Sequence, residues 1–269
     1  MQIGISTYSF PWSFGVTGFT PPELFTYKDL LLVAAKNKIR YVQFGDNYPL
    51  DKLPGEELES LKQLAEELQI NIQVGARGLT VLNVNNYIVI ARRLNSSFVR
   101  IVIDNDDYQP TEDEVIGIIS DIIPGLQRAK VKLLIENHDR FKAHVLKRII
   151  DNINSTWIGI CLDTTNSLGA GEGIQEVVEL LAPYTINLHI KDFNITRVEH
   201  RMGFKVNGCI AGEGMLDIPW LLKEIDKHGK CETATLELWS EPDQTIELTI
   251  RKEKIWADKS IDYLKTLIT

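Results

Sequence analysis

The sequence predicts a single α/β domain over residues 1–269 that folds as one (β/α)8 TIM barrel. Eight strand-like runs alternate with segments whose apolar residues recur at helical spacing, and this alternation is typical of a parallel sheet. Eight parallel strands close into a barrel, and 269 residues is close to the usual length of one. The predicted strands cover residues 2–7, 39–45, 70–75, 98–104, 131–136, 157–163, 185–191 and 233–238.

The predicted helices lie between these strands. The second repeats apolar residues from Leu58 to Leu68, and the fourth begins at Thr111-Glu112-Asp113-Glu114, a capping-box pattern that marks a helix N-terminus. The seventh runs from about Ile218 to His228. The last runs from about Arg251 to Leu267, where we expect it to close the barrel on its outside.

A doubly wound open sheet is the alternative fold. It ordinarily uses fewer strands, and no glycine-rich dinucleotide fingerprint follows the first strand. No linker, low-complexity stretch or block of charge divides the chain, which favours one domain.

Composition excludes several classes of protein. The net charge of −8 argues against binding nucleic acid through a broad basic surface. No apolar run approaches the roughly 18 residues of a membrane helix. The chain starts directly with a strand-like run, which leaves no room for a signal peptide, and three scattered cysteines indicate a reducing compartment. We therefore expect a cytoplasmic protein without nucleic-acid or membrane partners, for which a homo-oligomer stays open.

Four strand-like runs in the second half each end in a potential metal ligand. The ligands are Glu136, Asp163, His189 and Glu237, and the residues one and three positions before each are apolar. Side chains alternate between the two faces of a strand, so one face suits packing against helices and the other carries the ligand. Active sites of these barrels lie at the C-terminal ends of the strands. The pattern therefore predicts one divalent metal ion in the barrel mouth.

The predicted ligand set is mostly hard oxygen with one imidazole. It suits Mn²⁺ or Mg²⁺, and Zn²⁺ or Co²⁺ are the alternatives. Taken singly, a carboxylate at a strand end more often caps a helix or pairs with arginine. Four potential ligands on successive strands, three carboxylates and one histidine, favour a site.

Further residues are candidates for the pocket. Lys191 shares strand parity with His189 and should face the site, or else pair with a neighbouring carboxylate. Arg77 after the third strand and Arg197 in the long loop 193–214 could clamp a carboxylate or phosphate, or form surface ion pairs. The aromatic loop 8–15, the segment after Glu136 and the segment after Asp163 add four more candidates for binding substrate: Tyr8, Trp12, His138 and Asn166.

Several motifs in this order resemble the xylose isomerase-like barrel superfamily, and more narrowly its sugar phosphate isomerase/epimerase group. They are Ile135-Glu136-Asn137-His138, Cys161-Leu162-Asp163-Thr164-Thr165-Asn166-Ser167, Asn187-Leu188-His189-Ile190-Lys191-Asp192, Gly212-Glu213-Gly214, Leu216-Asp217-Ile218-Pro219 and Leu236-Glu237-Leu238-Trp239.

The resemblance implies that Glu136, Asp163, His189 and Glu237 coordinate the metal. It also implies that the two glutamates exchange protons with a substrate carbon, as in the family's ketose 3-epimerases. The chain departs from the family at Asn166, where epimerases and the related endonucleases often have histidine. It also lacks the histidines that the endonucleases carry after the second and fourth strands, which excludes a three-metal DNA-repair site.

These observations favour a metal-dependent isomerase or epimerase that acts on a small sugar, sugar phosphate or sugar acid through an enediolate. Glu136, Glu237 and Lys191 are its predicted catalytic residues. The first alternative is a decarboxylase of a 3-oxo sugar acid, in which Lys191 and an arginine hold the carboxylate. The second is a non-catalytic sugar-binding barrel.

Overall fold

The computed structural model describes residues 1–268 and shows the predicted barrel. Eight parallel strands form a closed barrel in the order β1-β10-β7-β6-β5-β4-β3-β2, which excludes the open sheet. All eight predicted strands are confirmed. They are β1 (Gln2–Ser6), β2 (Tyr41–Phe44), β3 (Asn71–Arg77), β4 (Phe98–Val102), β5 (Lys132–Glu136), β6 (Ile158–Asp163), β7 (Thr185–Ile190) and β10 (Thr233–Leu236).

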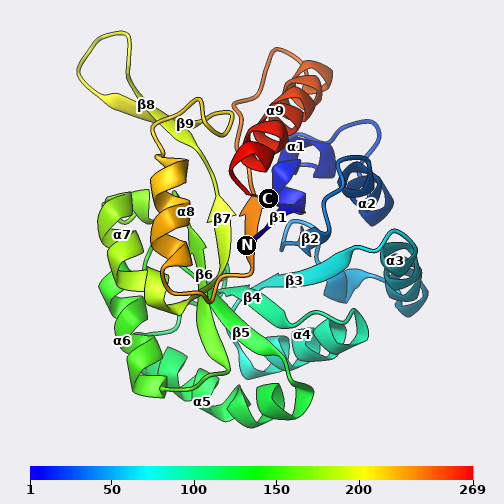
Figure 1. Ribbon diagram of the computed structural model, residues 1–269, viewed down its shortest axis with the longest axis vertical. Helices are drawn as coiled ribbons and strands as arrows, with labels where there is room; N and C mark the ends of the chain where they lie inside the picture. The colour runs from blue at the N-terminus through cyan, green and yellow to red at the C-terminus, as the bar shows by residue number, and fades with distance from the viewer. Residues whose placement is uncertain (269) are drawn as a thin grey trace.

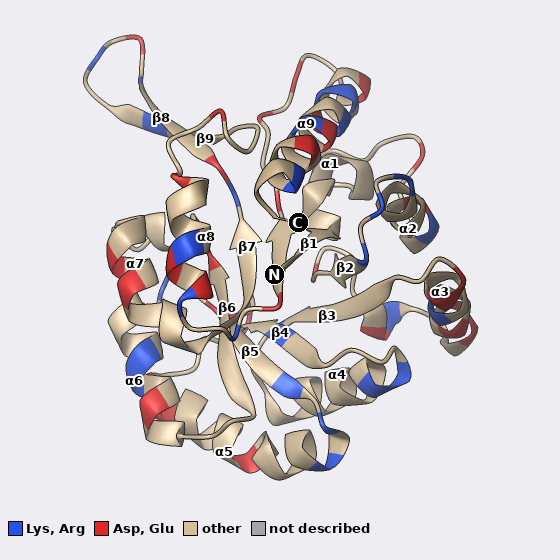
Figure 2. Cartoon of the chain, viewed as in Figure 1, with Lys and Arg blue, Asp and Glu red and all other residues tan. Residues whose placement is uncertain are grey.

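Helices surround the strands, and these outer helices carry many of the charged side chains (Figures 1 and 2). Within residues 1–268, none of them is long and apolar enough to cross a membrane. The helices are α1 (Pro11–Phe14), α2 (Tyr27–Lys36), α3 (Gly55–Glu67), α4 (Val81–Arg93), α5 (Glu112–Ala129), α6 (Ala143–Ile153), α7 (Ile174–Leu181), α8 (Ile218–Asp226) and α9 (Ile246–Leu267). Short 3₁₀ turns follow β1 at Thr7–Ser9 and β6 at Asn166–Leu168.

The helix boundaries agree with the sequence except in the last helix. Thr111 caps α5 through the predicted capping box. Helix α9 begins at Ile246, five residues before the predicted start at Arg251. The reason is the cap, because the Thr245 side chain accepts a hydrogen bond from the backbone of Leu248 and so fixes the first turn earlier.

The two faces of the barrel strands differ as predicted. Outward residues such as Leu133, Ile135, Leu162, Leu188 and Leu236 belong to the main hydrophobic core under the helices. The inward face combines a small apolar cluster with buried polar side chains. The cluster is Phe98, Leu134 and Cys161, and the polar side chains include Gln43, Gln73, Asn187, Thr233 and Thr235.

The segment 193–214, expected to be a long functional loop, contains a β-hairpin instead. Strands β8 (Phe193–Arg197) and β9 (Phe204–Gly208) pair antiparallel and project beyond the ring of helices (Figure 1). The alternation of Phe193 and Ile195, and of Phe204 and Val206, is the period-2 signal of a strand. The sequence analysis did not predict this hairpin.

The aromatic loop after β1 is packed against the segment after β10 and helix α9. Trp12 is buried, and its indole N–H donates to the backbone oxygen of Ser240 at 2.9 Å. The carboxylate of Glu253 on α9 accepts from the backbone of Trp12 at 2.7 Å and from the hydroxyl of Ser13 at 2.6 Å. Helix α9 thereby holds the loop that leads out of β1.

Replacing Glu253 with glutamine should remove a pH dependence of folding stability. Burial raises the pKa of Glu253 from its ordinary value of 4.5 to about 7. Between these values the folded state binds a proton that the unfolded state has released, so this group's contribution to stability falls as pH rises. The free energy of unfolding of wild type relative to the variant should be larger at pH 5 than at pH 8, by on the order of 1–3 kcal/mol. Denaturant titrations at both pH values measure it, and a difference independent of pH would contradict this assignment.

Candidate metal centre and active site

The four predicted ligands meet at the C-terminal mouth of the barrel. Glu136 ends β5, Asp163 ends β6, His189 lies near the end of β7, and Glu237 follows β10 directly. All four are buried. Nδ1 of His189 lies 3.3 Å from Oε1 of Glu237, 3.7 Å from Oδ2 of Asp163 and 3.9 Å from Oε1 of Glu136. The fold therefore converges three carboxylates on one imidazole nitrogen.

Hydrogen bonds inside the barrel set the orientation of His189. Its Nε2 lies 2.7 Å from Oε1 of Gln43, and the amide group of Gln43 donates to Asn187 at 3.0 Å. Asn187 in turn donates to Thr233. Because the amide oxygen of Gln43 can only accept, Nε2 carries a hydrogen, and Nδ1 is the ring nitrogen that faces the carboxylates.

Replacing Gln43 with leucine should weaken metal binding, since the ring of His189 loses the acceptor that fixes it. Such partners of a ligand are worth about 10–100-fold in metal affinity. Competitive titration of Mn²⁺ against a chelator measures the change. Gln73→Leu is the matched control, because Gln73 lies on the next strand and contacts Gln43 and Thr233 but not His189. Equal affinities in wild type and Gln43→Leu, or an equal loss in the control, would contradict the role.

Asp163 is held so that one oxygen faces the site. Oδ1 accepts from the backbone of Thr165 and of Asn166, each at 2.9 Å. The side chain of Asn137 clamps the same turn, since it accepts from the backbone N–H of Asp163 at 2.7 Å and donates to its carbonyl at 2.9 Å. Oδ2 is left to point toward His189 and Lys191.

Lys191 lies inside the ligand cluster. Its Nζ is 2.9 Å from Oδ2 of Asp163 and 3.0 Å from Oε2 of Glu237. Burial disfavours the ammonium, but the carboxylates of Asp163, Glu237 and Glu136 outweigh burial and hold the pKa of Lys191 well above its usual value. Asn166 bridges this cation to the next ligand, because its amide donates to Glu136 at 2.8 Å while its oxygen lies 3.4 Å from Nζ of Lys191.

A fully buried arginine, which the sequence analysis missed, supports Glu136 from the opposite side. Nε of Arg100 lies 2.9 Å from Oε2 of Glu136, and its Nη1 lies 3.0 Å from Asp46. Burial opposes ionisation of Asp46, but Arg100 and Arg77 outweigh it and hold the pKa of that carboxyl far below its usual range. The sequence offered one signal for Arg100, since it is a single charged residue within the apolar run of β4.

The donor set fits a divalent cation. Nδ1 of His189 is buried without a hydrogen-bond partner among the described residues. Oδ2 of Asp163 and Oε2 of Glu136 also lack a well-aligned hydrogen bond there, although a cation lies 2.9 Å from each. Buried acceptors of this kind cost free energy unless they bind a proton or an ion. Three carboxylates face two cations, Arg100 and Lys191, which leaves one negative charge for a metal to neutralise. His189 adds a nitrogen ligand. Burial alone would lower the pKa of His189, but the neighbouring carboxylates outweigh burial and raise it.

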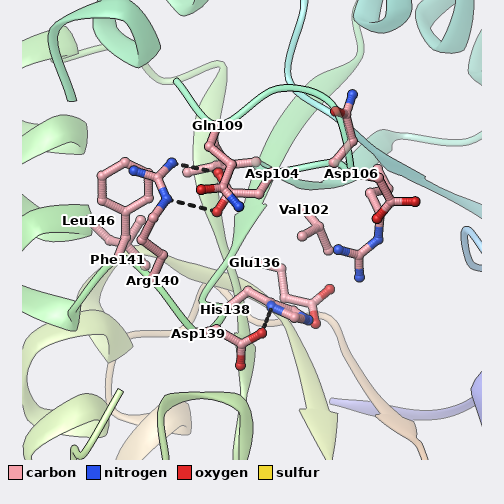
Figure 3. A pocket seen from close by; sticks show the side chains of 13 residues that line it. Val102, Asp104, Asp106, Gln109, Glu136, His138, Asp139, Arg140, Phe141 and Leu146 are labelled. Atoms are coloured by element: carbon pink, nitrogen blue, oxygen red, sulfur yellow. Dashed lines mark hydrogen bonds and ion pairs between the residues drawn. The ribbon is translucent and has the colours of Figure 1, made fainter. Parts of the chain in front are cut away.

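The other predicted residues are distributed around this centre. Arg77 and His138 line a cavity of about 390 Å³ that has Glu136 in its wall (Figure 3). Tyr8 is half-buried, and burial together with the nearby Asp46 raises the pKa of its phenol. The structure does not bring Trp12 and Arg197 to the ligands. Trp12 packs in the β1 loop, and Arg197 is exposed on the hairpin with its guanidinium 4.5 Å from the ring of Phe204.

Comparisons with known proteins agree with this architecture. The family model described as xylose isomerase-like TIM barrel matches residues 31–267. The 3-oxo-isoapionate decarboxylase of Pectobacterium atrosepticum is 32% identical over 266 residues, which cover 99% of this chain and 96% of that protein.

Solved structures share the fold at lower identity. D-psicose 3-epimerase with D-tagatose from Clostridium cellulolyticum superposes with a TM-score of 0.71 at 14% identity, covering 100% of this chain and 99% of the other. A xylose isomerase-like TIM barrel protein from Mycobacterium smegmatis in complex with magnesium gives 0.70 at 10% identity, covering 98% and 97%. The sequence match and the closed barrel together mean that the chain belongs to the xylose isomerase-like TIM barrel family.

Proposed function

We propose that this chain is a divalent-metal-dependent decarboxylase of a 3-oxo sugar acid, with 3-oxo-isoapionate as the first substrate to test. The observation that carries the proposal is the ammonium of Lys191 within 3.0 Å of two predicted metal ligands, Asp163 and Glu237. A cation beside a Lewis-acid site can hold a carboxylate next to a ketone. The relative with 32% identity over nearly the whole chain is named for this reaction.

Glu136, Asp163, His189 and Glu237 would hold the ion. Their oxygen-rich set favours Mn²⁺ or Mg²⁺ over Zn²⁺ or Co²⁺. When bound, the ion would supply a Lewis acid for the negative charge that develops on the ketone oxygen.

Lys191 carries the two remaining tasks in this proposal. Its ammonium pairs with the substrate carboxylate before the reaction. The bond between the carboxyl carbon and its neighbour then breaks, CO₂ leaves, and the electron pair moves into the ketone to give an enediolate. The ammonium now lies beside the carbon that lost CO₂, so it donates a proton there and regains one from water. Proton, electron pair and leaving group are all accounted for.

The contacts of Glu136 favour this route over the isomerase or epimerase that the sequence first suggested. That route needs a glutamate free to take a proton from carbon. Here Oε1 of Glu136 already accepts from Asn166 at 2.8 Å, and Oε2 lies 2.9 Å from the guanidinium of Arg100. Such a carboxylate suits holding a metal better than moving between protonation states. Ketose isomerisation or epimerisation stays the second candidate, because the family includes epimerases and both glutamates face the mouth.

A cytoplasmic location is part of the same proposal. Cys161, Cys209 and Cys231 are all free thiols, which is typical of proteins in a reducing compartment.

Reconstitution with metal tests the proposed activity. The chain is stripped with a chelator, reloaded with Mn²⁺, Mg²⁺, Zn²⁺ or Co²⁺, and assayed for CO₂ release from 3-oxo-isoapionate. We expect release to vanish on stripping and to return best with Mn²⁺ or Mg²⁺. Full activity of the stripped chain, or no release with any of the four ions, would overturn the proposal.

A further inference from the structure

A cavity of about 390 Å³ opens beside the metal centre, between the ends of β4 and β5. Glu136 forms one wall, so whatever is bound at the metal can extend into it. Figure 3 shows Glu136 and His138 on one side of this cavity, with Asp104, Gln109 and Arg140 on the other. The volume is at the small end of the ~300–1,000 Å³ typical of ligand pockets, which suits a few-carbon chain.

The cations of this cavity are already committed to carboxylates. Arg140 forms a forked ion pair with Asp104, with Nε 2.8 Å from Oδ2, and its guanidinium lies 4.1 Å from the ring of Phe141. Arg77 is paired with Asp46 at 2.7 Å. Such paired and stacked guanidinium groups are fixed in place, and their charge is largely neutralised.

Carboxylates outnumber arginines along the wall. Asp104, Asp106, Asp139 and Glu136 line the cavity together with Arg77 and Arg140, so four negative groups face two positive ones. Even when Glu136 is counted as a metal ligand, the remaining carboxylates still outnumber the arginines in the wall. A phosphate dianion would meet like charge here, which disfavours its binding.

The same lining suits hydroxyl groups. A hydroxyl both donates and accepts, so it can donate to a carboxylate of an existing ion pair and accept from the remaining N–H groups of Arg140. Phe141 and Leu146 add apolar surface for the C–H groups of a carbon chain. The substrate's carboxylate is accounted for elsewhere, at Lys191, so this end of the substrate needs no charge.

We propose that the cavity beside Glu136 binds the uncharged, hydroxylated end of the substrate and selects against a phosphate ester at that position. This rests on the proposed sugar-acid substrate and narrows it to unphosphorylated acids.

Binding of two simple probes to the metal-loaded full chain tests the proposal. Erythritol and erythritol 4-phosphate are titrated with detection by saturation-transfer NMR. We expect erythritol to bind and its phosphate ester to bind at least about tenfold more weakly, given the like charge of the wall. Equal or tighter binding of the phosphate ester would overturn the proposal, as would no binding of erythritol.

A filling substitution locates the binding. Gln109→Trp should occupy the cavity and weaken erythritol binding at least about tenfold. Thr156→Trp is the matched control, because Thr156 lines another cavity at the N-terminal ends of the strands. Erythritol binding that survives Gln109→Trp, or is lost equally in the control, contradicts the assignment.

The CO₂ assay on the same samples separates the two proposals. Selective erythritol binding without CO₂ release from any 3-oxo acid would overturn the decarboxylase alone. CO₂ release without the predicted probe selectivity would overturn the cavity assignment alone.

Discussion

Replacing Asp163 with alanine should abolish metal retention and lower CO₂ release by at least about 10³-fold. The side chain supplies a buried oxygen, Oδ2, that faces His189, and hydrogen bonds to Oδ1 fix its position. Without it the proposed ion loses a ligand and Lys191 loses a partner, and Lewis-acid stabilisation alone is worth several kcal/mol. Elemental analysis after dialysis against Mn²⁺, together with the CO₂ assay, measures both effects.

Two comparisons make this prediction specific. His189→Ala should lose metal in the same way, because Nδ1 of His189 is the nitrogen on which the carboxylates converge. Asp262→Ala removes an exposed carboxylate on α9 and should change neither quantity. Undiminished metal content in both Asp163→Ala and His189→Ala would refute the ligand assignment.

Replacing Lys191 with methionine should lower kcat/KM for the 3-oxo acid by about 10²–10⁴-fold, the range for loss of a general acid. Methionine keeps much of the length and apolar volume of lysine but can neither pair with the substrate carboxylate nor return a proton. Metal content should be retained, since none of the four ligands is changed. The kinetic assay and elemental analysis on one preparation show whether the two effects separate.

Lys205→Met is the control for this variant, because Lys205 is an exposed lysine on the hairpin whose ion pair is with Glu241. It should leave kcat/KM within a few-fold of wild type. Activity of Lys191→Met within tenfold of wild type would mean that the ammonium neither holds the carboxylate nor returns the proton.

Much of the fold could be predicted because the barrel strands carry a strong signal. Leu133 and Ile135, three and one positions before Glu136, mark the face of β5 that packs under the helices and so the direction of its ligand, and the other three ligand strands repeat this pattern. The hairpin was missed because it lies within the long connection between β7 and α8, where a functional loop was the simpler expectation. Its own alternation was visible in the sequence.

The polar residues that hold the predicted ligands in place were harder to predict from the sequence. The sequence indicates that Arg100, Gln43 and Gln73 are polar residues within strands, but it does not say which ligands they touch. Those contacts depend on barrel closure and register, which bring Gln43 on β2 across the interior to His189 on β7. Such long-range pairs leave no local pattern in the chain.

The same limit explains why the sequence favoured an isomerase or epimerase, whereas the contacts in the structure favour a decarboxylase. From the sequence, two glutamates at strand ends favoured proton transfer. In the structure one of them, Glu136, is engaged by both Arg100 and Asn166, and Lys191 is drawn into the cluster. A non-catalytic sugar-binding barrel would give this cation no task in bond breaking, and the Lys191→Met kinetics address that alternative too.

Incubation of the metal-loaded chain in D₂O is the most direct test of the decarboxylase. One sample receives 3-oxo-isoapionate, and a second receives a panel of ketoses and ketose phosphates. We expect CO₂ from the acid, one deuterium on the carbon of the product that carried the carboxyl group, and no deuterium in recovered ketoses. Deuterium entering the ketoses, with no CO₂ from the acid, would contradict the decarboxylase and establish proton transfer as the reaction of this site.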